Sequence, residues 1–320
     1  MMQERIKISV IVPFFNVEKF IGKCAGSLMR QTLRDSIEYL FVDDGSTDNS
    51  AAELERALSG FPERKAQIRM LSNDGNRGTA FSRERGLQDA QGEFVVFCDA
   101  DDRVEPQMYA EMLAEAERTG ADIVCCGFIV ESASGSSIKG FKSPTFPPLN
   151  EAPLDTLHFS MCNKIVRRAL ITQNGLHFFP GIDCWEDLGM MARILAVTDK
   201  ISIIDKAYYR YRRVAGESIT TSRMERVLAD HLLMADALSD WLHGKFGNRY
   251  DKFVNYLKFT AKIKLMRRGT RNVKRWKATF PETNRHIMSY KNIPLYYRLA
   301  FWSAAHTPTF LLKCADRLLR

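Results

Sequence analysis

Short apolar runs alternate with segments of helical periodicity along the first half of the chain. The runs have the length of buried strands, and the segments between them repeat apolar residues at helical spacing. The pattern predicts strands over residues 6–13, 38–43, 68–71, 93–98 and 122–130, and helices over residues 18–31, 50–58 and 78–90. Strands and helices that alternate in this way are typical of a mostly parallel sheet flanked by helices. We therefore expect an α/β fold with a Rossmann-like sheet.

The pattern changes beyond this sheet. Residues 131–153 are rich in Ser, Gly and Pro, which indicates a surface excursion rather than a linker between domains. Residues 223–245 and 250–268 have the spacing of long amphipathic helices. We predict one domain over residues 1–222 and a basic helical region over residues 223–320.

Composition is that of a soluble globular protein, because 45% of the residues are apolar and 26% are charged. The seven cysteines are scattered and form no CxxC pair, so we expect reduced thiols rather than disulfides or a zinc site. The N-terminus has no charged-then-apolar leader, and no run of about 18 apolar residues occurs. These features predict a cytoplasmic location.

Acidic residues follow two strands of the predicted sheet at the points where those strands end. Asp43 and Asp44 follow the second strand, and Asp99, Asp101 and Asp102 follow the fourth. Ligands of parallel sheets bind at the carboxyl ends of the strands, so both loops indicate one site. The later loop could hold Mg²⁺ or Mn²⁺, which would neutralise charge on a diphosphate leaving group. Taken alone, these residues are equally consistent with an acidic turn that caps the next helix.

Two further features have the chemistry of a nucleotide site. A carboxylate of Asp43 or Asp44 can accept a hydrogen bond from a uracil N–H or a ribose hydroxyl, and Gly45 lets backbone approach a ligand closely. The alternative, a turn with Asp48 as helix N-cap, leaves two adjacent carboxylates unexplained. Arg83 suits phosphate oxygens by its fixed charge and bidentate geometry, although taken alone it is typical of a solvated surface charge.

A third acidic pair, Glu186 and Asp187, precedes an apolar helix over residues 188–195. Either carboxylate could deprotonate an acceptor hydroxyl, a step that contributes roughly 10² to 10⁴ in rate. The pair could also be no more than charge at a helix N-terminus. The aromatic and basic run over residues 208–213 could stack on a sugar or clamp phosphates, or it could form an edge strand.

These segments occur in a fixed order along the chain. They are Ser9 to Pro13 with Asn16, Val42 to Asp48, Asn76 to Gly78 with Arg83, Gly92 to Asp102, Asn163-Lys164 with Arg167-Arg168, Glu186-Asp187, and Tyr211-Arg212 before Ser218 to Thr220. Each motif is weak alone, but the ordered set resembles family 2 of the inverting glycosyltransferases, which have the A-type glycosyltransferase fold (GT-A). The resemblance covers about residues 6–222.

The resemblance implies transfer of one sugar from a nucleoside-diphosphate donor, with UDP as the expected nucleotide, to an acceptor hydroxyl. The anomeric carbon would be inverted, and the acceptor would be a glycan or a lipid-linked molecule of cell-surface or capsular polysaccharide or glycolipid assembly.

The resemblance also implies a role for each candidate residue. Those implied to bind the nucleotide are Pro13, Asn16, Asp43, Asp44, Arg83, Asp99 and Arg212. Those implied to hold Mn²⁺ or Mg²⁺, in a DXD-type motif, are Asp99, Asp101 and Asp102. Asp187, beside Glu186, would be the general base, and Arg212 with the loop to Thr220 would close as a lid over the diphosphate.

Three positions depart from the common pattern of the family. Phe15 stands where a Tyr is frequent, and Glu84 stands where an Asn often follows the Arg. Trp185 stands where a Gly usually precedes the acidic pair, and it could narrow the acceptor subsite or stack against it. The acceptor class is therefore more open than the activity.

Positive charge is concentrated in the last part of the chain. From Arg249 onward 17 Lys and Arg face three acidic residues, while the whole chain has a net charge of +8. Basic residues over 267–277, followed by aromatic residues over 296–302, suit an anionic membrane surface. Our hypothesis is that residues 249–320 bring a peripheral enzyme to lipid-linked glycans at the cytoplasmic leaflet; the alternative is a solvated helical cap. We expect no nucleic-acid partner, since no binding motif accompanies the charge.

Two other functions compete with transfer. A noncatalytic nucleotide-sugar-binding scaffold of the same fold is disfavoured, because the metal-site acids and Asp187 are all present. A nucleotidyltransferase or a dehydrogenase is disfavoured, because neither GxGxxG nor GxxxxGK[ST] occurs.

Overall fold

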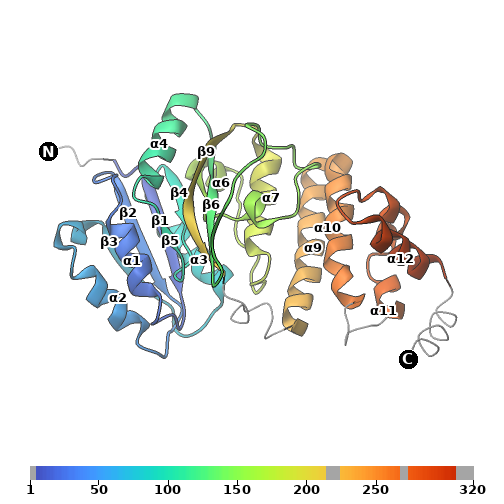
Figure 1. Cartoon of the computed structure of the whole chain (residues 1–320), viewed down its shortest axis with the longest axis horizontal. Helices are drawn as coiled ribbons and strands as arrows, with labels where there is room; N and C mark the ends of the chain where they lie inside the picture. The colour runs from blue at the N-terminus through green and yellow to red at the C-terminus, as the bar shows by residue number, and fades with distance from the viewer. Residues whose placement is uncertain (1–4, 214–223, 267–272, 308–320) are drawn as a thin grey trace. The chain divides into compact units, whose positions relative to one another are not determined.

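The computed structural model describes residues 5–213, 224–266 and 273–307 (Figure 1). The chain divides into two compact units, residues 1–148 with 155–218 and residues 149–154 with 219–320. The predicted boundary after residue 222 lies outside the described residues, so the division into 1–222 and 223–320 stays a prediction.

The described part of the first unit is built on a nine-stranded sheet. Its strands are β1 (Ile8–Phe14), β2 (Ile37–Asp43), β3 (Ile68–Ser72), β4 (Phe94–Phe97), β5 (Arg103–Val104), β6 (Ile123–Ser132), β7 (Gly135–Lys139), β8 (Lys164–Arg167) and β9 (Ile201–Arg212). Their order is β3-β2-β1-β4-β8-β6-β9-β5, with β7 paired to β6. The predicted α/β class is confirmed. The first four strands pair in parallel, and antiparallel pairing enters where β8 lies between β4 and β6.

Helices cover both faces of this sheet (Figure 1). The described ones are α1 (Ile21–Met29), α2 (Ser50–Leu58), η1 (Pro62–Gln67), α3 (Thr79–Asp89), α4 (Met108–Thr119), α5 (Thr156–Phe159), α6 (Arg168–Gln173) and α7 (Glu186–Val197). Side chains alternate along a strand, so Val10 and Val12 of β1 share a core with α1 and α4. Ile11, between them, faces α3, where a Cβ on Gly86 would lie 2.3 Å from Ile11 Cγ2. α3 therefore packs on the opposite face, so closely that only glycine fits at position 86.

The predicted surface excursion over residues 131–153 begins as a hairpin whose residues 132–138 are exposed. β6 continues to Ser132, which pairs with Gly135 at the start of β7. Gly135 has φ +121°, a conformation open mainly to glycine, so Ala133 and Ser134 form a tight turn. Of the small residues in this segment, Gly135 is the one that the turn requires.

The C-terminal region is helical, which confirms the predicted helical extension. Its described elements are α9 (Met224–Phe246), η2 (Gly247–Tyr250), α10 (Asp251–Ile263), η3 (Lys264–Met266), α11 (Val273–Ala278), η4 (Pro281–Ser289) and α12 (Leu295–His306). Phe259, Trp276 and Tyr290 belong to its core, where the rings of Phe259 and Tyr290 stack with centroids 4.9 Å apart. Within the described residues, every helix is too short or too polar to cross a membrane.

Candidate active site

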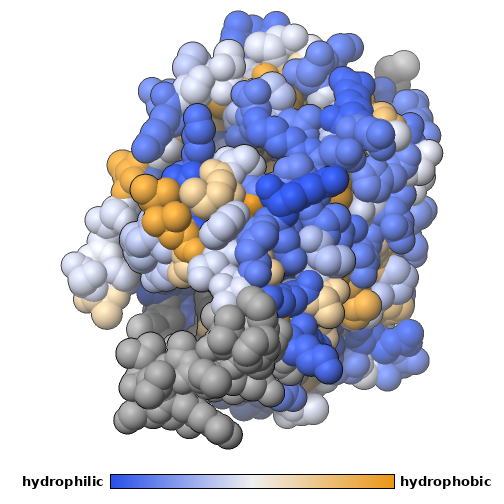
Figure 2. Space-filling model, turned by 90° about the vertical axis from the view of Figure 1, so that its right-hand side faces the viewer, coloured by the Kyte–Doolittle hydropathy of each residue, from blue (hydrophilic) through white to orange (hydrophobic). Residues whose placement is uncertain are grey.

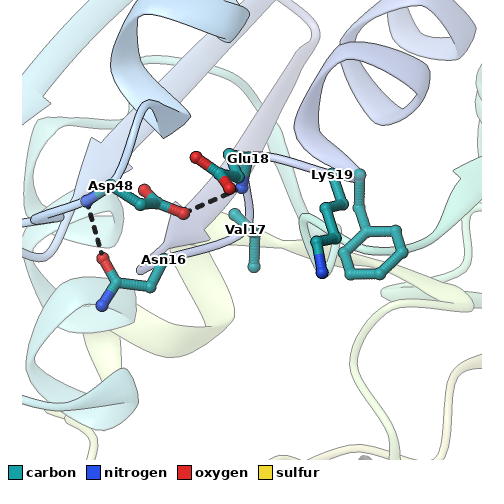
Figure 3. Close-up of a pocket in the computed structure, with 6 residues that line it drawn as sticks. Asn16, Val17, Glu18, Lys19 and Asp48 are labelled. Carbon is teal, nitrogen blue, oxygen red and sulfur yellow. Dashed lines mark hydrogen bonds between the residues drawn. The ribbon is translucent and has the colours of Figure 1, made fainter.

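The loop after β1 is tied to the loop before α2, mainly by Asn16. This residue has φ +52°, a left-handed conformation that Asn tolerates. Its side-chain oxygen accepts from the Thr47 backbone N–H at 2.8 Å, and its Nδ2 donates to Thr47 Oγ1 at 3.2 Å. A pocket opens between these loops, with Asn16 and Asp48 on one side and Lys19 on the other (Figure 3). The pocket is lined by Asn16, Val17, Glu18, Lys19, Phe20 and Asp48.

Pro13 and Asp43 lie beside this pocket on neighbouring strands. Pro13 is opposite Val42 in the pairing of β1 with β2, one residue from the level of Asp43. The Asp43 carboxylate accepts from the Ser46 backbone N–H at 2.9 Å, which turns the loop that Asn16 also binds. Three predicted nucleotide-binding residues, Pro13, Asn16 and Asp43, therefore gather at one edge of the sheet.

Asp44 holds a different loop, the one between β3 and α3. Only 4% of its surface is exposed. Its carboxylate accepts from the backbone N–H groups of Arg77 and Gly78, both at 2.9 Å, and from Asn73 Nδ2 at 2.8 Å. The Asp44 carboxylate is thus hydrogen-bonded to three protein donors, and it fixes the position of residues 73–78 beside the site.

Asp183, which was not among the predicted site residues, lies at the start of α3. Its Oδ1 accepts from the Ala80 backbone N–H at 3.2 Å. Gly78 has φ +93°, and a Cβ there would lie 2.3 Å from Asp183 Oδ1. Because the two contacting residues are 103 positions apart, no local sequence signal could have identified this contact.

The loop after β4 carries three carboxylates with unlike surroundings. Asp102 is 2% exposed and accepts from the Arg212 backbone N–H at 2.7 Å. Burial, and then the charges of Asp99 and Asp101, raise the pKa of Asp102 to about 8. Asp101 is more exposed and lies 3.4 Å from Arg212 Nη2; burial and then Asp99 raise its pKa as well. The charge of Asp99 therefore disfavours the ionisation of both Asp101 and Asp102.

β9 positions this loop from behind. The buried Tyr209 hydroxyl accepts from the Asp99 backbone N–H at 3.0 Å and also hydrogen-bonds the Asp102 carboxyl. The Arg212 guanidinium lies over the Phe20 ring, 3.8 Å from its centroid, and so links the acidic loop to the pocket beside β1. The run over residues 208–213 is a strand as far as Arg212, and its alternation directs Tyr209 inward.

Arg83 of α3 is buried among acidic side chains from two other elements. Its Nη2 donates to Asp99 Oδ1 at 2.8 Å, its Nη1 lies 3.4 Å from Glu186 Oε1, and it forms a further ion pair with Asp187. Burial works against the positive charge, yet Glu186 and Asp99 raise the pKa of the guanidinium above its ordinary value. The acidic loop after β4 and the acidic pair at the start of α7 therefore meet on one guanidinium.

Glu186 and Asp187 form the first turn of α7. Burial raises the pKa of Glu186, while Arg83 opposes that rise. The other carboxylate oxygen of Asp187, Oδ2, accepts from the Met161 backbone N–H at 3.2 Å and from Ser160 Oγ at 3.4 Å. Asp187 is therefore held from both sides and keeps about a fifth of its side chain exposed, 21%.

Lys164 lies behind the loop that contacts Asp187, with none of its surface exposed. Its Nζ donates to the carbonyls of Leu157 and Ser160, both at 2.8 Å, and to Asn163 Oδ1 at 2.7 Å. Burial lowers the pKa of this ammonium. Asn163 and Lys164 belong to one of the ordered motifs, but the residues around them do not show that the ammonium of Lys164 is buried, so no role could be predicted from the sequence.

The acidic loop fits a metal ion only with help from a ligand. Within the described residues, no group of three or more His, Cys, Asp or Glu is arranged to hold a metal ion. The three predicted ligands do not form such a group, because Asp102 faces the protein and accepts from Arg212. Asp99 and Asp101, each more than a third exposed, fit a cation that shares one or two carboxylates with donor phosphates.

The positions that depart from the family pattern have distinct settings. Glu84 accepts from the Phe178 backbone N–H at 3.0 Å and contacts His177, so it anchors the segment that leads to α7. Trp185 has φ +67°, an uncommon conformation for a bulky residue, directly before the acidic pair. The predicted lid from Ser218 to Thr220 lies outside the described residues.

Comparison with known proteins identifies relatives of one kind. The family described as "Glycosyl transferase family 2" matches residues 9–175. An uncharacterized glycosyltransferase, EpsJ of Bacillus subtilis, is 31% identical over 235 residues, which are 70% of this chain and 66% of EpsJ. The poly(ribitol-phosphate) beta-N-acetylglucosaminyltransferase TarS of Staphylococcus aureus is 29% identical over 275 residues, 81% of this chain and 47% of TarS. The chain thus spans only part of the length of these relatives, 66% of EpsJ and 47% of TarS.

Solved structures have the same fold. The crystal structure of S. aureus TarS 1–349 has a TM-score of 0.67 at 22% identity and covers 93% of this chain and 89% of that one. A mannosyltransferase of Pyrobaculum calidifontis, in complex with GDP-Man and Mn²⁺, has a TM-score of 0.56 at 17% identity and covers 94% of this chain and 86% of that one. The family match over more than half of the chain, with a fold shared by these structures, shows that the protein belongs to glycosyl transferase family 2 and has the A-type glycosyltransferase fold.

Proposed function

We propose that this protein transfers one sugar from a UDP-sugar to an acceptor hydroxyl and inverts the anomeric carbon. The observation that carries the proposal is the convergence on Arg83 of Asp99, at the end of β4, with Glu186 and Asp187, at the start of α7. A transferase of this kind needs a diphosphate-binding group and a base within reach of one reacting carbon. Both kinds of group occur here around one buried charge.

The donor nucleotide would bind at the carboxyl ends of β1 and β2. Pro13, Asn16 and Asp43 gather there, and Asp44 fixes the adjacent loop. S. aureus TarS has been crystallised with UDP and with UDP-GlcNAc, which supports a uridine nucleotide for this member of the same family. Arg212 would contact the diphosphate from β9.

Asp99 and Asp101 would hold Mn²⁺ or Mg²⁺ together with donor phosphates, and the Mn²⁺ of the P. calidifontis mannosyltransferase complex supports such an ion. A divalent cation at this position supplies positive charge to the departing diphosphate. Asp102, which is buried and bonded to Arg212 and Tyr209, would keep the loop in shape rather than bind the ion.

Asp187 would act as the general base. Its carboxylate takes the proton of the acceptor hydroxyl as that oxygen bonds to the anomeric carbon, and the bond from this carbon to the diphosphate oxygen breaks on the opposite face. Arg83 forms an ion pair with Asp187, and Ser160 and Met161 hold the second carboxylate oxygen. A correctly placed base of this kind contributes roughly 10² to 10⁴ in rate.

The test is nucleotide release from a panel of UDP-, GDP- and dTDP-sugars, with Mn²⁺, with Mg²⁺ or with EDTA. We expect metal-dependent release of UDP by the wild type, and a loss of at least about 100-fold in Asp101→Ala and in Asp187→Ala. Binding of donors without turnover, even with lipid-phosphate acceptors supplied, would instead support the noncatalytic scaffold.

We also propose that the second unit binds an anionic membrane surface, where the enzyme reaches its acceptor. α12 is apolar on two sides: Phe301 and Ala304 pack in the core of the unit, whereas Leu295, Leu299 and Trp302, on a separate stripe, are each about half exposed. Figure 2 shows a cluster of hydrophobic side chains on a mostly hydrophilic face. Residues 273–307 carry six Lys and Arg and one acidic residue, which suits anionic lipid.

Sedimentation with vesicles tests this surface. We expect the full chain to bind phosphatidylglycerol vesicles and to bind phosphatidylcholine vesicles at least about ten times more weakly. Leu299→Ser with Trp302→Ser should abolish binding, whereas Ile138→Ser, which changes an even more exposed residue of β7, should leave it unchanged. Absence of binding by the full chain would overturn the membrane proposal and favour the solvated cap.

A further inference from the structure

A single peptide group connects a buried lysine to the proposed base. The carbonyl of Ser160 accepts from Lys164 Nζ at 2.8 Å, and the N–H of Met161 donates to Asp187 Oδ2 at 3.2 Å. These two groups belong to the same planar peptide unit, and the described residues contain no cis peptide bond. In a trans unit the carbonyl and the N–H point in opposite directions. Lys164 therefore contacts one end of a rigid group whose other end contacts Asp187.

The ammonium of Lys164 is fully used by this loop. An ammonium has three N–H donors, and Lys164 directs them to Leu157 O, Ser160 O and Asn163 Oδ1, all within 2.8 Å. Asn163 in turn donates to the Cys126 carbonyl of β6 at 2.7 Å, so the loop is attached to the sheet. The orientation of the Ser160–Met161 peptide is thus determined by the sheet through Lys164.

A buried ammonium at position 164 costs free energy of folding, so we expect it to have a function that an apolar side chain could not provide. Lys164 has no exposed surface, and its three hydrogen-bond acceptors are neutral. Buried charges without an opposite charge cost free energy. An ammonium on the Ser160 carbonyl also polarises the peptide, which strengthens the bond from the Met161 N–H to a carboxylate.

We propose that Lys164 is a positioning residue for the transfer reaction: through the Ser160–Met161 peptide it sets the orientation of the Asp187 carboxylate. The proposal rests on the assignment of Asp187 as the base. Lys164 itself touches neither donor nor acceptor, so its loss should lower turnover and leave donor binding unchanged. A displaced base of this kind costs on the order of 100-fold in rate.

The chain offers a matched control in its second unit. Lys262 is also fully buried, and its Nζ donates to Thr279 O and Phe280 O, both at 3.0 Å, and to Asn284 Oδ1 at 2.6 Å. Lys262→Met removes the same number of hydrogen bonds as Lys164→Met. We expect both variants to lose thermal stability, but only Lys164→Met to lose turnover.

The experiment measures UDP release by the full-length protein from the donor sugar that the wild type turns over, together with UDP binding by calorimetry. Lys164→Met should lower kcat by about 10² and change the KM for the donor and the Kd for UDP by less than about threefold. In an Asp187→Asn background the same substitution should have less than about a threefold effect, because the group that Lys164 orients is already inactive. Lys164→Gln, whose amide still donates two hydrogen bonds, replaces Lys164→Met if the latter does not fold.

The outcomes separate this proposal from the one on which it rests. Equal factors for Lys164→Met in the wild-type and Asp187→Asn backgrounds, or a kcat as unaffected as that of Lys262→Met, would overturn the positioning role while Asp187 stands as the base. If Asp187→Asn keeps wild-type turnover, the assignment of the base fails, and the role of Lys164 fails with it.

Discussion

Replacement of Asp44 by alanine isolates the contribution of one buried carboxylate to the shape of the donor site. The carboxylate accepts three hydrogen bonds, from Arg77 N–H, Gly78 N–H and Asn73 Nδ2, at 2.8 to 2.9 Å. A buried donor that loses its acceptor costs about 1 to 3 kcal/mol. Arg77 is exposed and its N–H can find water, so we take the lower value, which gives about 3 kcal/mol for three donors.

This loss can be measured as a change in melting temperature. For a unit of about 200 residues, 3 kcal/mol corresponds to a decrease of about 6 to 12 °C. Donor affinity should fall as well, because residues 73–78 then lose the anchor that fixes them beside the site. Thermal unfolding and calorimetric titration with UDP report the two effects separately.

A neighbouring carboxylate provides the control. Asp74 lies on the same loop with 83% of its side chain exposed, and its ion pair with Arg77 is at the surface. Asp74→Ala should change the free energy of unfolding by less than about 0.5 kcal/mol. If Asp44→Ala and Asp74→Ala melt within a degree of each other, the hydrogen bonds to Asp44 do not hold this loop, and the reasoning is refuted.

Three further predictions follow from the site. Gly78→Ala should lower stability by about 2 to 4 kcal/mol, from a φ of +93° and a Cβ 2.3 Å from Asp183 Oδ1; adding Asp183→Ala should restore only part of the loss in a denaturant titration. The pKa of Asp102 is raised to about 8 in the folded protein, so its contribution to stability is fully present below pH 4 and is lost as the pH rises through 8. Wild-type stability should therefore decline between pH 6 and pH 8 by up to about 1.4 kcal/mol per pH unit relative to Asp102→Asn, and parallel pH curves for the two proteins would contradict this. Arg83→Lys should lower turnover by about 100-fold, because one ammonium cannot replace the separate nitrogens that contact Asp99 and the α7 acids; wild-type kinetics would exclude the bridging role.

Local patterns in the sequence were sufficient to predict the central strands and helices of the fold. The apolar runs that form β1, β2, β3 and β4 are short and are followed by polar residues, and α1 has an apolar stripe of its own. Such patterns depend only on residues a few positions apart, so they can be recognised without information about the rest of the chain. β8 was not predicted as a strand, since its place between β4 and β6 depends on pairing between distant segments.

The chemical nature of the site could also be predicted from the sequence, but the role of each residue could not. Carboxylates at the ends of parallel strands must lie at one edge, so Asp43 and Asp99 could be assigned to the same site. Which of several adjacent carboxylates faces solvent depends on side chains from remote strands. Asp44 is saturated by the β3–α3 loop and Asp102 by Arg212, and neither contact has a local signature.

By itself, therefore, the sequence determined the fold class, the order of the motifs and the edge of the sheet at which the chemistry lies. Only the tertiary structure decided that Arg83, which alone is typical of a surface charge, is buried between two acidic groups, and that Lys164 is buried beneath the loop that holds Asp187. The physical reason is that the burial of a charge depends on hydrogen-bond partners that arrive from distant segments of the chain. Those partners exist as a set only after the chain has folded.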